Sequence, residues 1–190
     1  MPNYVIGNTG GQRLGNATYV QYGYGQVEPN HLSAQRTGQI YAQLPAKSDI
    51  EILENGQFAK YDYAAGVVDF DGEGEWMMVF NEIKVYKDRD ADADFAMIKG
   101  NYVARVYSSN GTMMPADTTM VPRLIKINVG DIWTTNTVKE TELAVGDKLT
   151  PGADGYLAKA GADAADYVVK VVKVYTMPDG QKGVKLQRIA

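Results

Sequence analysis

Side chains able to carry out catalysis are scarce in this sequence. His31 is the only histidine, cysteine is absent, and serine occurs only at positions 33, 48, 108 and 109. A Ser-His-Asp hydrolase needs its histidine as general base, and zinc sites are built mainly from Cys and His. His31 lies in an N-terminal segment of unusual composition, so we interpret it as a polar residue of that segment and expect neither mechanism.

Carboxylates are the remaining candidates. The segment 88–94 alternates Asp with other residues, a pattern that a hard cation such as calcium favours. Counted as an EF-hand loop from Asp88, however, the glycine position holds Ala93 and the glutamate position holds Lys99, so the motif fails. A glycosidase needs two carboxylates at one cleft, and no pair stands out. We interpret segments 69–75 and 88–94 as solvated acidic loops, and we expect no metal, no cofactor and no enzymatic activity.

Composition and charge argue against three further classes of function: membrane proteins, proteins exported by a signal peptide and nucleic-acid-binding proteins. The chain has 190 residues, 22% of them charged, and a net charge of -4. Its apolar runs are far shorter than the roughly 20 residues of a membrane span, and its first residues lack the features of a signal peptide. Residues 49–94 hold 13 acidic and 4 basic side chains, a net charge of -9, and no dense basic run occurs elsewhere. We therefore expect no membrane insertion, no export by a signal peptide and no direct nucleic-acid binding.

The elements that would position any site are predicted to be strands. Apolar and β-branched residues dominate 75–86 and 167–175, whose first halves are apolar on both faces, as in central strands. Val184–Gln187 alternates and should turn one face to water. Asn55-Gly56 and Asp154-Gly155 are typical hairpin turns. The sequence predicts an all-β fold, in which short antiparallel strands form one or two small β-barrel or sandwich units with little helix.

Residues 1–35 differ from the rest and predict an extended N-terminal arm. Only Arg13 and Glu28 are charged there, whereas glycine and tyrosine are frequent. Val20, Tyr22 and Tyr24 alternate with polar residues or glycine in the two-residue period of a strand. Fully extended, the arm would reach about 110 Å, far beyond a radius of gyration of about 16 Å for the compact chain. The predicted organisation is therefore an arm (1–35), an acidic β-rich unit (36–108), a linker (109–122) and a C-terminal small β-barrel unit (123–190).

Several sequence segments resemble parts of the small structural proteins of tailed bacteriophage heads. They are Gly38–Pro45, Gly74–Glu82, Val129–Asn136, and Val145–Thr150 leading to Asp154–Leu157. These segments are similar in sequence to phage capsid decoration proteins, also called auxiliary head or cement proteins. The resemblance implies a non-enzymatic virion protein, made in the host bacterial cytoplasm, that binds the outside of an assembled capsid and stabilises it.

This resemblance implies the major capsid protein and neighbouring copies of the chain as partners, with a homo-oligomer on the shell. The residues alone agree with an arm that docks by strand addition. We hypothesise that Tyr19, Val20, Tyr22 and Tyr24 bind the capsid, while the acidic region 69–94 faces solvent. The alternative is a phage head fibre or adhesin module that binds host glycans, which predicts Trp133 and Tyr156 exposed in a groove. A third interpretation is a β-rich domain whose arm completes its own sheet.

Overall fold

The computed structural model describes residues 27–34, 38–81, 120–140, 142–161, 166–177 and 182–190, and the backbone of four short strands outside these ranges. Its regular elements are β-strands, so the predicted all-β class with little helix is confirmed for the described residues.

The first nine strands are β1 (Tyr4–Val5), β2 (Val27–His31), β3 (Ile40–Tyr41), β4 (Ile52–Glu54), β5 (Phe58–Asp62), β6 (Val67–Asp69), β7 (Met77–Val79), β8 (Lys84–Val85) and β9 (Ala93–Asp94). They are followed by β10 (Ala96–Ile98), β11 (Leu124–Ile125), β12 (Ile132–Thr135), β13 (Glu142–Leu143), β14 (Lys148–Pro151), β15 (Leu157–Lys159), β16 (Val169–Thr176) and β17 (Lys182–Arg188).

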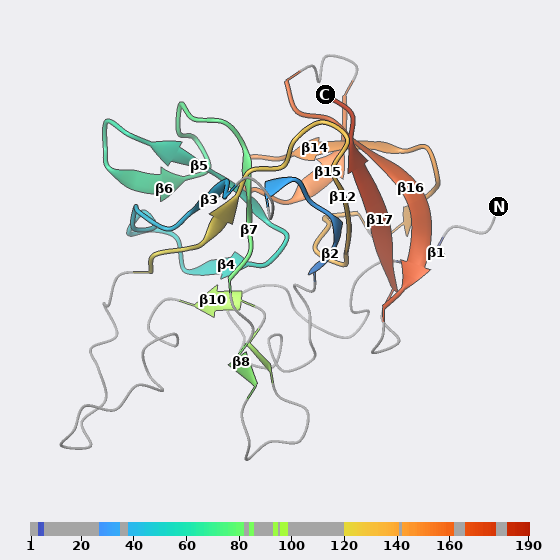
Figure 1. Cartoon of the computed structure of the whole chain (residues 1–190), viewed down its shortest axis with the longest axis horizontal. Coiled ribbons are helices and arrows are strands. Elements are labelled where there is room, and N and C mark those ends of the chain that lie inside the picture. Colours follow the sequence, from blue (N-terminus) through green and yellow to red (C-terminus); the bar gives the residue numbers. More distant parts are fainter. Residues whose placement is uncertain are drawn as a thin grey trace.

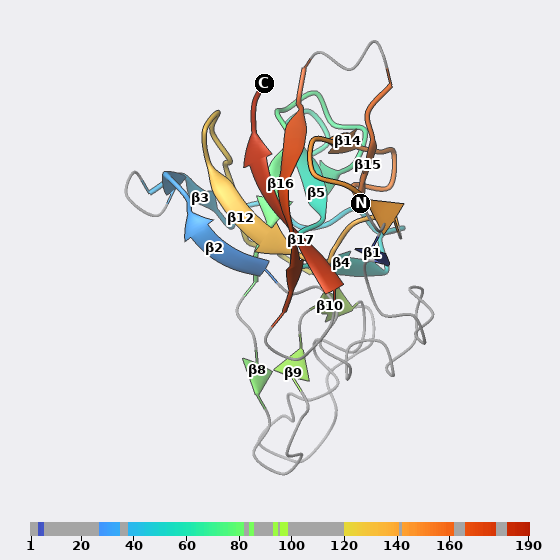
Figure 2. The ribbon, with the colours of Figure 1, turned by 90° about the vertical axis from the view of Figure 1, so that its right-hand side faces the viewer.

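Two antiparallel sheets form the body of the molecule (Figure 1). The six-stranded sheet has the order β15-β14-β16-β17-β12-β2, and the five-stranded sheet has the order β3-β11-β7-β5-β6. Three further pairs, β1-β13, β4-β10 and β8-β9, are two-stranded. Figure 2 shows β16, β17, β12 and β2 side by side, with β17 in the middle of its sheet.

The two sheets pack face to face around the main core. One row of the five-stranded sheet runs through Ile40, Ile125, Met78 and Phe58, which are successive cross-strand partners. These side chains pack with the inward residues of the six-stranded sheet, among them Trp133, Leu149, Val169, Val171, Val184 and Leu186. The arrangement is that of a β-sandwich.

A second core covers the other face of the five-stranded sheet. There Ala59, Met77, Val79 and Leu124 pack with residues outside the two large sheets such as Ile50 and Leu53. Met77, Met78 and Val79 are therefore all buried, although their side chains point alternately to opposite faces. The predicted central strand with two apolar faces is confirmed for β7.

Other strand predictions hold only in part. Val184 and Leu186 are buried while Lys185 and Gln187 are half-buried, as the alternation predicts. Asp154-Gly155 does close a hairpin, because β14 pairs with β15. The predicted hairpin at Asn55-Gly56 is wrong: the turn forms, with Gly56 at a φ of 90°, but β4 pairs with β10 whereas β5 pairs with β6 and β7.

Two strands pair across the predicted unit boundaries. Strand β2, from the predicted arm, pairs with β12 at the edge of the six-stranded sheet. Strand β11, from the predicted C-terminal unit, lies between β3 and β7 in the five-stranded sheet. Val27, Leu32 and Ala34 are buried in the main core, so this part of the predicted arm belongs to the body.

Candidate functional site

The four predicted capsid-binding residues, Tyr19, Val20, Tyr22 and Tyr24, lie outside the described residues. The strands on either side of them are described. Strand β1 pairs with β13 through Tyr4 opposite Leu143 and Val5 opposite Glu142. Strand β2 pairs with β12 in the six-stranded sheet. The N-terminal part of the chain thus enters the body as added antiparallel strands at both ends of the segment that holds the predicted site.

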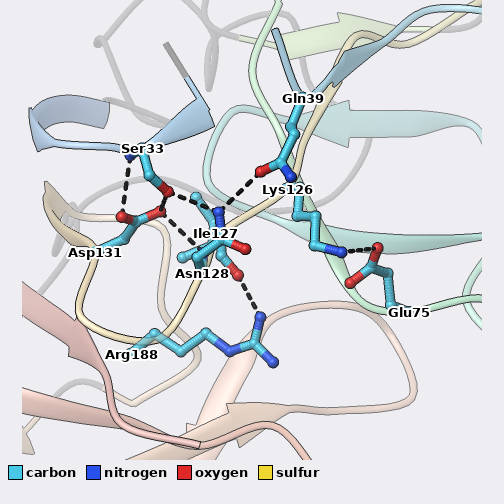
Figure 3. A network of polar contacts seen from close by, with 8 residues as sticks. All are labelled: Ser33, Gln39, Glu75, Lys126, Ile127, Asn128, Asp131 and Arg188. Atoms are coloured by element: carbon cyan, nitrogen blue, oxygen red, sulfur yellow. Dashed lines mark hydrogen bonds and ion pairs between the residues drawn. The ribbon is translucent and has the colours of Figure 1, made fainter. Parts of the chain in front are cut away.

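A polar clamp holds the chain directly after β2 (Figure 3). The carboxylate of Asp131 accepts hydrogen bonds from Ser33 N at 3.0 Å, Ser33 Oγ at 2.9 Å and Asn128 N at 2.9 Å. Asn128 Nδ2 donates to Ser33 Oγ and to Gln39 Oε1, at 2.6 and 2.8 Å. In a Ser-His-Asp triad an imidazole lies between the hydroxyl and the carboxylate, whereas here the Ser33 hydroxyl bonds the Asp131 carboxylate directly. We interpret this cluster as the anchor that fixes the C-terminal end of β2 to the body.

Arg188 closes the same region from the other side. Its guanidinium donates a hydrogen bond to the carbonyl oxygen of Ile127 and lies 4.2 Å from the ring centroid of Tyr167. Burial raises the pKa of Tyr167 far above its usual range, because the phenolate would be desolvated. The phenol is therefore neutral at physiological pH and contributes packing rather than acid–base chemistry.

A pocket of about 520 Å³ opens where the two sheets meet at one end. Its walls come from the loop 47–52, from the residues at and after the end of β6, and from the β14–β15 turn. Among the described residues, the lining contains five carboxylates and one lysine, Lys47; the carboxylates are those of Asp49, Glu51, Asp69, Asp71 and Asp154. This concentration of negative charge is the most distinctive feature of the pocket.

One ion pair lies in the wall of this pocket. Lys47 Nζ is 2.5 Å from Asp69 Oδ2 and 3.9 Å from Asp49 Oδ2. Burial alone would raise the pKa of Asp69, but the hydrogen bonds from Lys47 and the backbone N–H of Phe70 outweigh burial and hold that pKa below its usual value. The hydrogen bond to Asp69 raises the pKa of Lys47 in turn. Both side chains are thus charged across the physiological range.

Replacing Asp69 with asparagine should destabilise the protein in a pH-dependent way. Because the folded-state pKa of Asp69 lies below 3.8, its carboxylate stabilises the fold above that pH, and the effect is lost as pH falls through the folded-state pKa. We expect Asp69→Asn to lower the urea midpoint at neutral pH, and we expect this deficit to shrink as the pH falls below the usual aspartate pKa of about 3.9.

Asp49→Asn is the matched control for this prediction, since Asp49 is exposed and lies 3.9 Å from the same lysine. Exposed ion pairs contribute little, so this variant should resemble the wild type at every pH. A deficit of Asp69→Asn that has the same size at acidic and neutral pH would assign the effect to packing and contradict the ion-pair explanation.

The aromatic residues predicted for a glycan-binding groove are not exposed. Trp133 is 0% exposed, and Tyr156 is 8% exposed in the pocket wall. That specific expectation of the adhesin alternative is therefore wrong. The large exposed aromatic side chain in the described part of the chain is Tyr63, at 73%.

The acidic segment 69–75 is only partly a solvated loop. Asp71 and Glu73 are exposed as predicted, but Asp69 is buried and paired with Lys47. The sequence does contain both charges, but they lie 22 positions apart, and no local pattern joins them. The side chains of 82–94 lie outside the described residues.

Among the described residues, no group of three or more His, Asp or Glu side chains is placed to hold a metal ion. Within the same ranges no helix has the length and hydropathy needed to cross a membrane. Comparisons with protein-family models, with curated proteins and with solved structures found no match for this chain.

Proposed function

We propose that the protein is a non-enzymatic virion structural protein that binds the outside of an assembled phage capsid. In this proposal it stabilises the shell through its N-terminal arm and its β-rich body, and its partners are the major capsid protein and neighbouring copies of itself. Its location is the capsid surface of the virion, after synthesis in the host bacterial cytoplasm. The resemblance of four sequence segments to phage head proteins supports this function.

The observation that carries the proposal is the composition of the segment between the two N-terminal strands. Strands β1 and β2 both join the body as antiparallel partners of later strands, β13 and β12. Strand addition supplies affinity through main-chain hydrogen bonds, and alternate side chains supply specificity. The residues between them, 6–26, include the three tyrosines Tyr19, Tyr22 and Tyr24 and only one charge, Arg13. Such a composition suits burial against another protein.

The experiment is co-sedimentation of the purified protein with undecorated capsid shells of the source phage. The truncated variant should lack residues 1–26 and retain Val27, because Val27 is 8% exposed in the main core and begins β2. A second variant, Tyr19→Ser, Tyr22→Ser and Tyr24→Ser, keeps the full length and removes the aromatic area. Truncation to residue 35 would also remove Leu32 and Ser33 and would confuse binding with folding.

We expect saturable binding of the full chain at a fixed copy number per capsid subunit, and loss of most binding in both variants. Binding by the truncated protein at full strength would place the contact in the body instead of the arm. Failure of the folded full-length protein to bind would refute capsid decoration. A positive glycan array in that case would support the adhesin alternative.

A further inference from the structure

The outer face of the six-stranded sheet carries four lysines: Lys148, Lys170, Lys173 and Lys185. We call this surface the lysine face. Their strand neighbours Leu149, Val169, Val171, Val184 and Leu186 are buried in the main core. Because successive side chains of a strand point to opposite faces, the four lysines point away from the core. Lys148, Lys170 and Lys173 are exposed and Lys185 is half-buried.

A β-bulge brings Lys173 to this face. Val171 pairs with Leu186, but the next registered pair is Lys173 with Lys185, so Val172 is an extra residue in β16. In a regular strand Lys173 would share the inward face with Val171. The bulge re-aims it outward and places it opposite Lys185.

The lysine face therefore contains two like-charge pairs in direct cross-strand register. Lys148 lies opposite Lys170, and Lys173 lies opposite Lys185. Side chains so placed have Cβ atoms about 5 Å apart, and like charges there destabilise the sheet. The acid on the same row, Glu28, lies two strands beyond Lys185, at about 10 Å. Where the described residues offer no compensating charge for such like-charge pairs, the pattern is typical of a functional surface.

Four other lysines of the described chain have acidic partners, whereas Lys60 lies over the ring of Trp76 and Lys182 donates to Thr176. Lys47, Lys126, Lys139 and Lys159 form ion pairs with Asp69, Glu75, Asp154 and Asp147 respectively. Across the described ranges, none of the four residues of the lysine face has such a partner. The positive charge of this face is thus available to an external anionic group.

The complementary surface lies on the same protein. We call Asp49, Glu51 and Asp71, the exposed carboxylates at the rim of the pocket, the acidic rim. The pocket borders the side of the β14–β15 turn that meets the five-stranded sheet, where Phe58 N donates to Gly155 O at 2.7 Å. The lysine face is the opposite, outward surface of the six-stranded sheet. The two charged surfaces therefore face different directions and leave each other unneutralised within one chain.

We propose that the lysine face binds the acidic rim of a second copy of this chain. The contact is heterologous, so a dimer presents one free lysine face at one end and one free acidic rim at the other, and further copies can add. Charge complementarity of this kind fixes register and weakens with salt. A nucleic acid fits this face less well, because Arg188 is engaged with Ile127 and Tyr167 and the lysines form no continuous run. The contact deepens the proposed function, which already names neighbouring copies as partners, but it uses neither the arm nor a capsid and is therefore tested without either.

Sedimentation velocity of the full chain tests the proposal. At about 30 mM NaCl we expect concentration-dependent association that weakens at least tenfold by about 500 mM NaCl. The variant Lys170→Glu with Lys173→Glu should be monomeric, and so should Asp49→Lys with Glu51→Lys. The matched control, Lys139→Glu with Lys159→Glu, changes net charge equally to the first variant but leaves the lysine face intact and should still associate.

A mixture of the two monomeric variants gives the sharpest outcome. The first retains its acidic rim and the second retains its lysine face, so together they should form a 1:1 complex although neither associates alone. Lys170→Glu also places a glutamate opposite Lys148. The thermal midpoint of the variant Lys170→Glu with Lys173→Glu should therefore equal or exceed that of the wild type, and this result would show that the variant is folded. A wild type that stays monomeric at low salt, a mixture that does not dimerise, or lysine-face variants that instead lose binding to a short DNA duplex would each overturn the proposal.

Discussion

The variant Gly155→Ala is expected to lose most of the stability of the protein. Gly155 has a φ of 75°, and a Cβ at this position would lie 2.1 Å from the carbonyl oxygen of Phe58. That oxygen belongs to the backbone of β5, so no side-chain rotation relieves the overlap. The turn must withdraw and break the hydrogen bond from Phe58 N to Gly155 O, through which the two sheets meet. We expect a cost of about 4 kcal/mol or more in urea unfolding.

Gly146→Ala is the matched control for this substitution. Gly146 also has a positive φ, 100°, but a Cβ there meets nothing within 4 Å. It should therefore cost only the backbone strain of a left-handed alanine, about 1–2 kcal/mol. The difference between the two variants isolates the steric contribution of the sheet junction. Equal unfolding midpoints for both variants would contradict the close approach at Gly155.

The variant Trp133→Ala should have an effect of comparable size for a different reason. Trp133 is wholly buried in the main core, and its ring lies 6.2 Å from that of Phe58, which in turn lies 5.2 Å from Tyr167. Truncation opens a cavity between the two sheets, at a cost of about 3–5 kcal/mol. The measurement is the free energy of unfolding in urea, followed by circular dichroism because the tryptophan signal changes.

Trp133→Phe retains most of the ring volume and should cost about 1–2 kcal/mol. Tyr63→Ala is the surface comparison, since Tyr63 is 73% exposed and contacts Tyr61 edge-on at 5.6 Å; it should cost about 1 kcal/mol or less. If Trp133→Ala lowered the free energy of unfolding no more than Tyr63→Ala does, the assignment of Trp133 to the sandwich core would be wrong.

The fold class follows from local sequence patterns, whereas the strand partners do not. Two apolar faces at Met77–Val79 and clean alternation at Val184–Gln187 correctly indicate a central strand and a one-sided strand. The Asn55-Gly56 turn led to a wrong hairpin prediction, because the residues of a turn specify only about four positions of local backbone. The pairing of β4 with β10 and of β5 with β7 depends instead on which apolar side chains are buried together with residues far away in the sequence. Nothing local distinguishes a hairpin turn from a turn that sends two strands to different sheets.

The lysine face shows the same limit at a smaller scale. Lys170 and Lys173 are three positions apart, so strict alternation places them on opposite faces of β16. Only the bulge at Val172 unites them, and a bulge is defined by the partner strand. The pocket carboxylates were missed for a similar reason, because the pocket wall joins the loop 47–52 to a turn about 100 residues later. The predicted arm site, Tyr19 to Tyr24, remains a prediction from sequence.

The position of β17 also determines when the protein can fold. In the order β15-β14-β16-β17-β12-β2, the strand that comes last of the six in the sequence, β17, joins β16 to β12. A nascent chain that ends before Lys182 holds only a three-stranded and a two-stranded remnant of this sheet. At typical translation rates, β2 waits about 10 to 30 s for β17 to be synthesised. The six-stranded sheet is therefore completed only after Arg188 has left the ribosome, and a polypeptide that ends before Lys182 cannot assemble it.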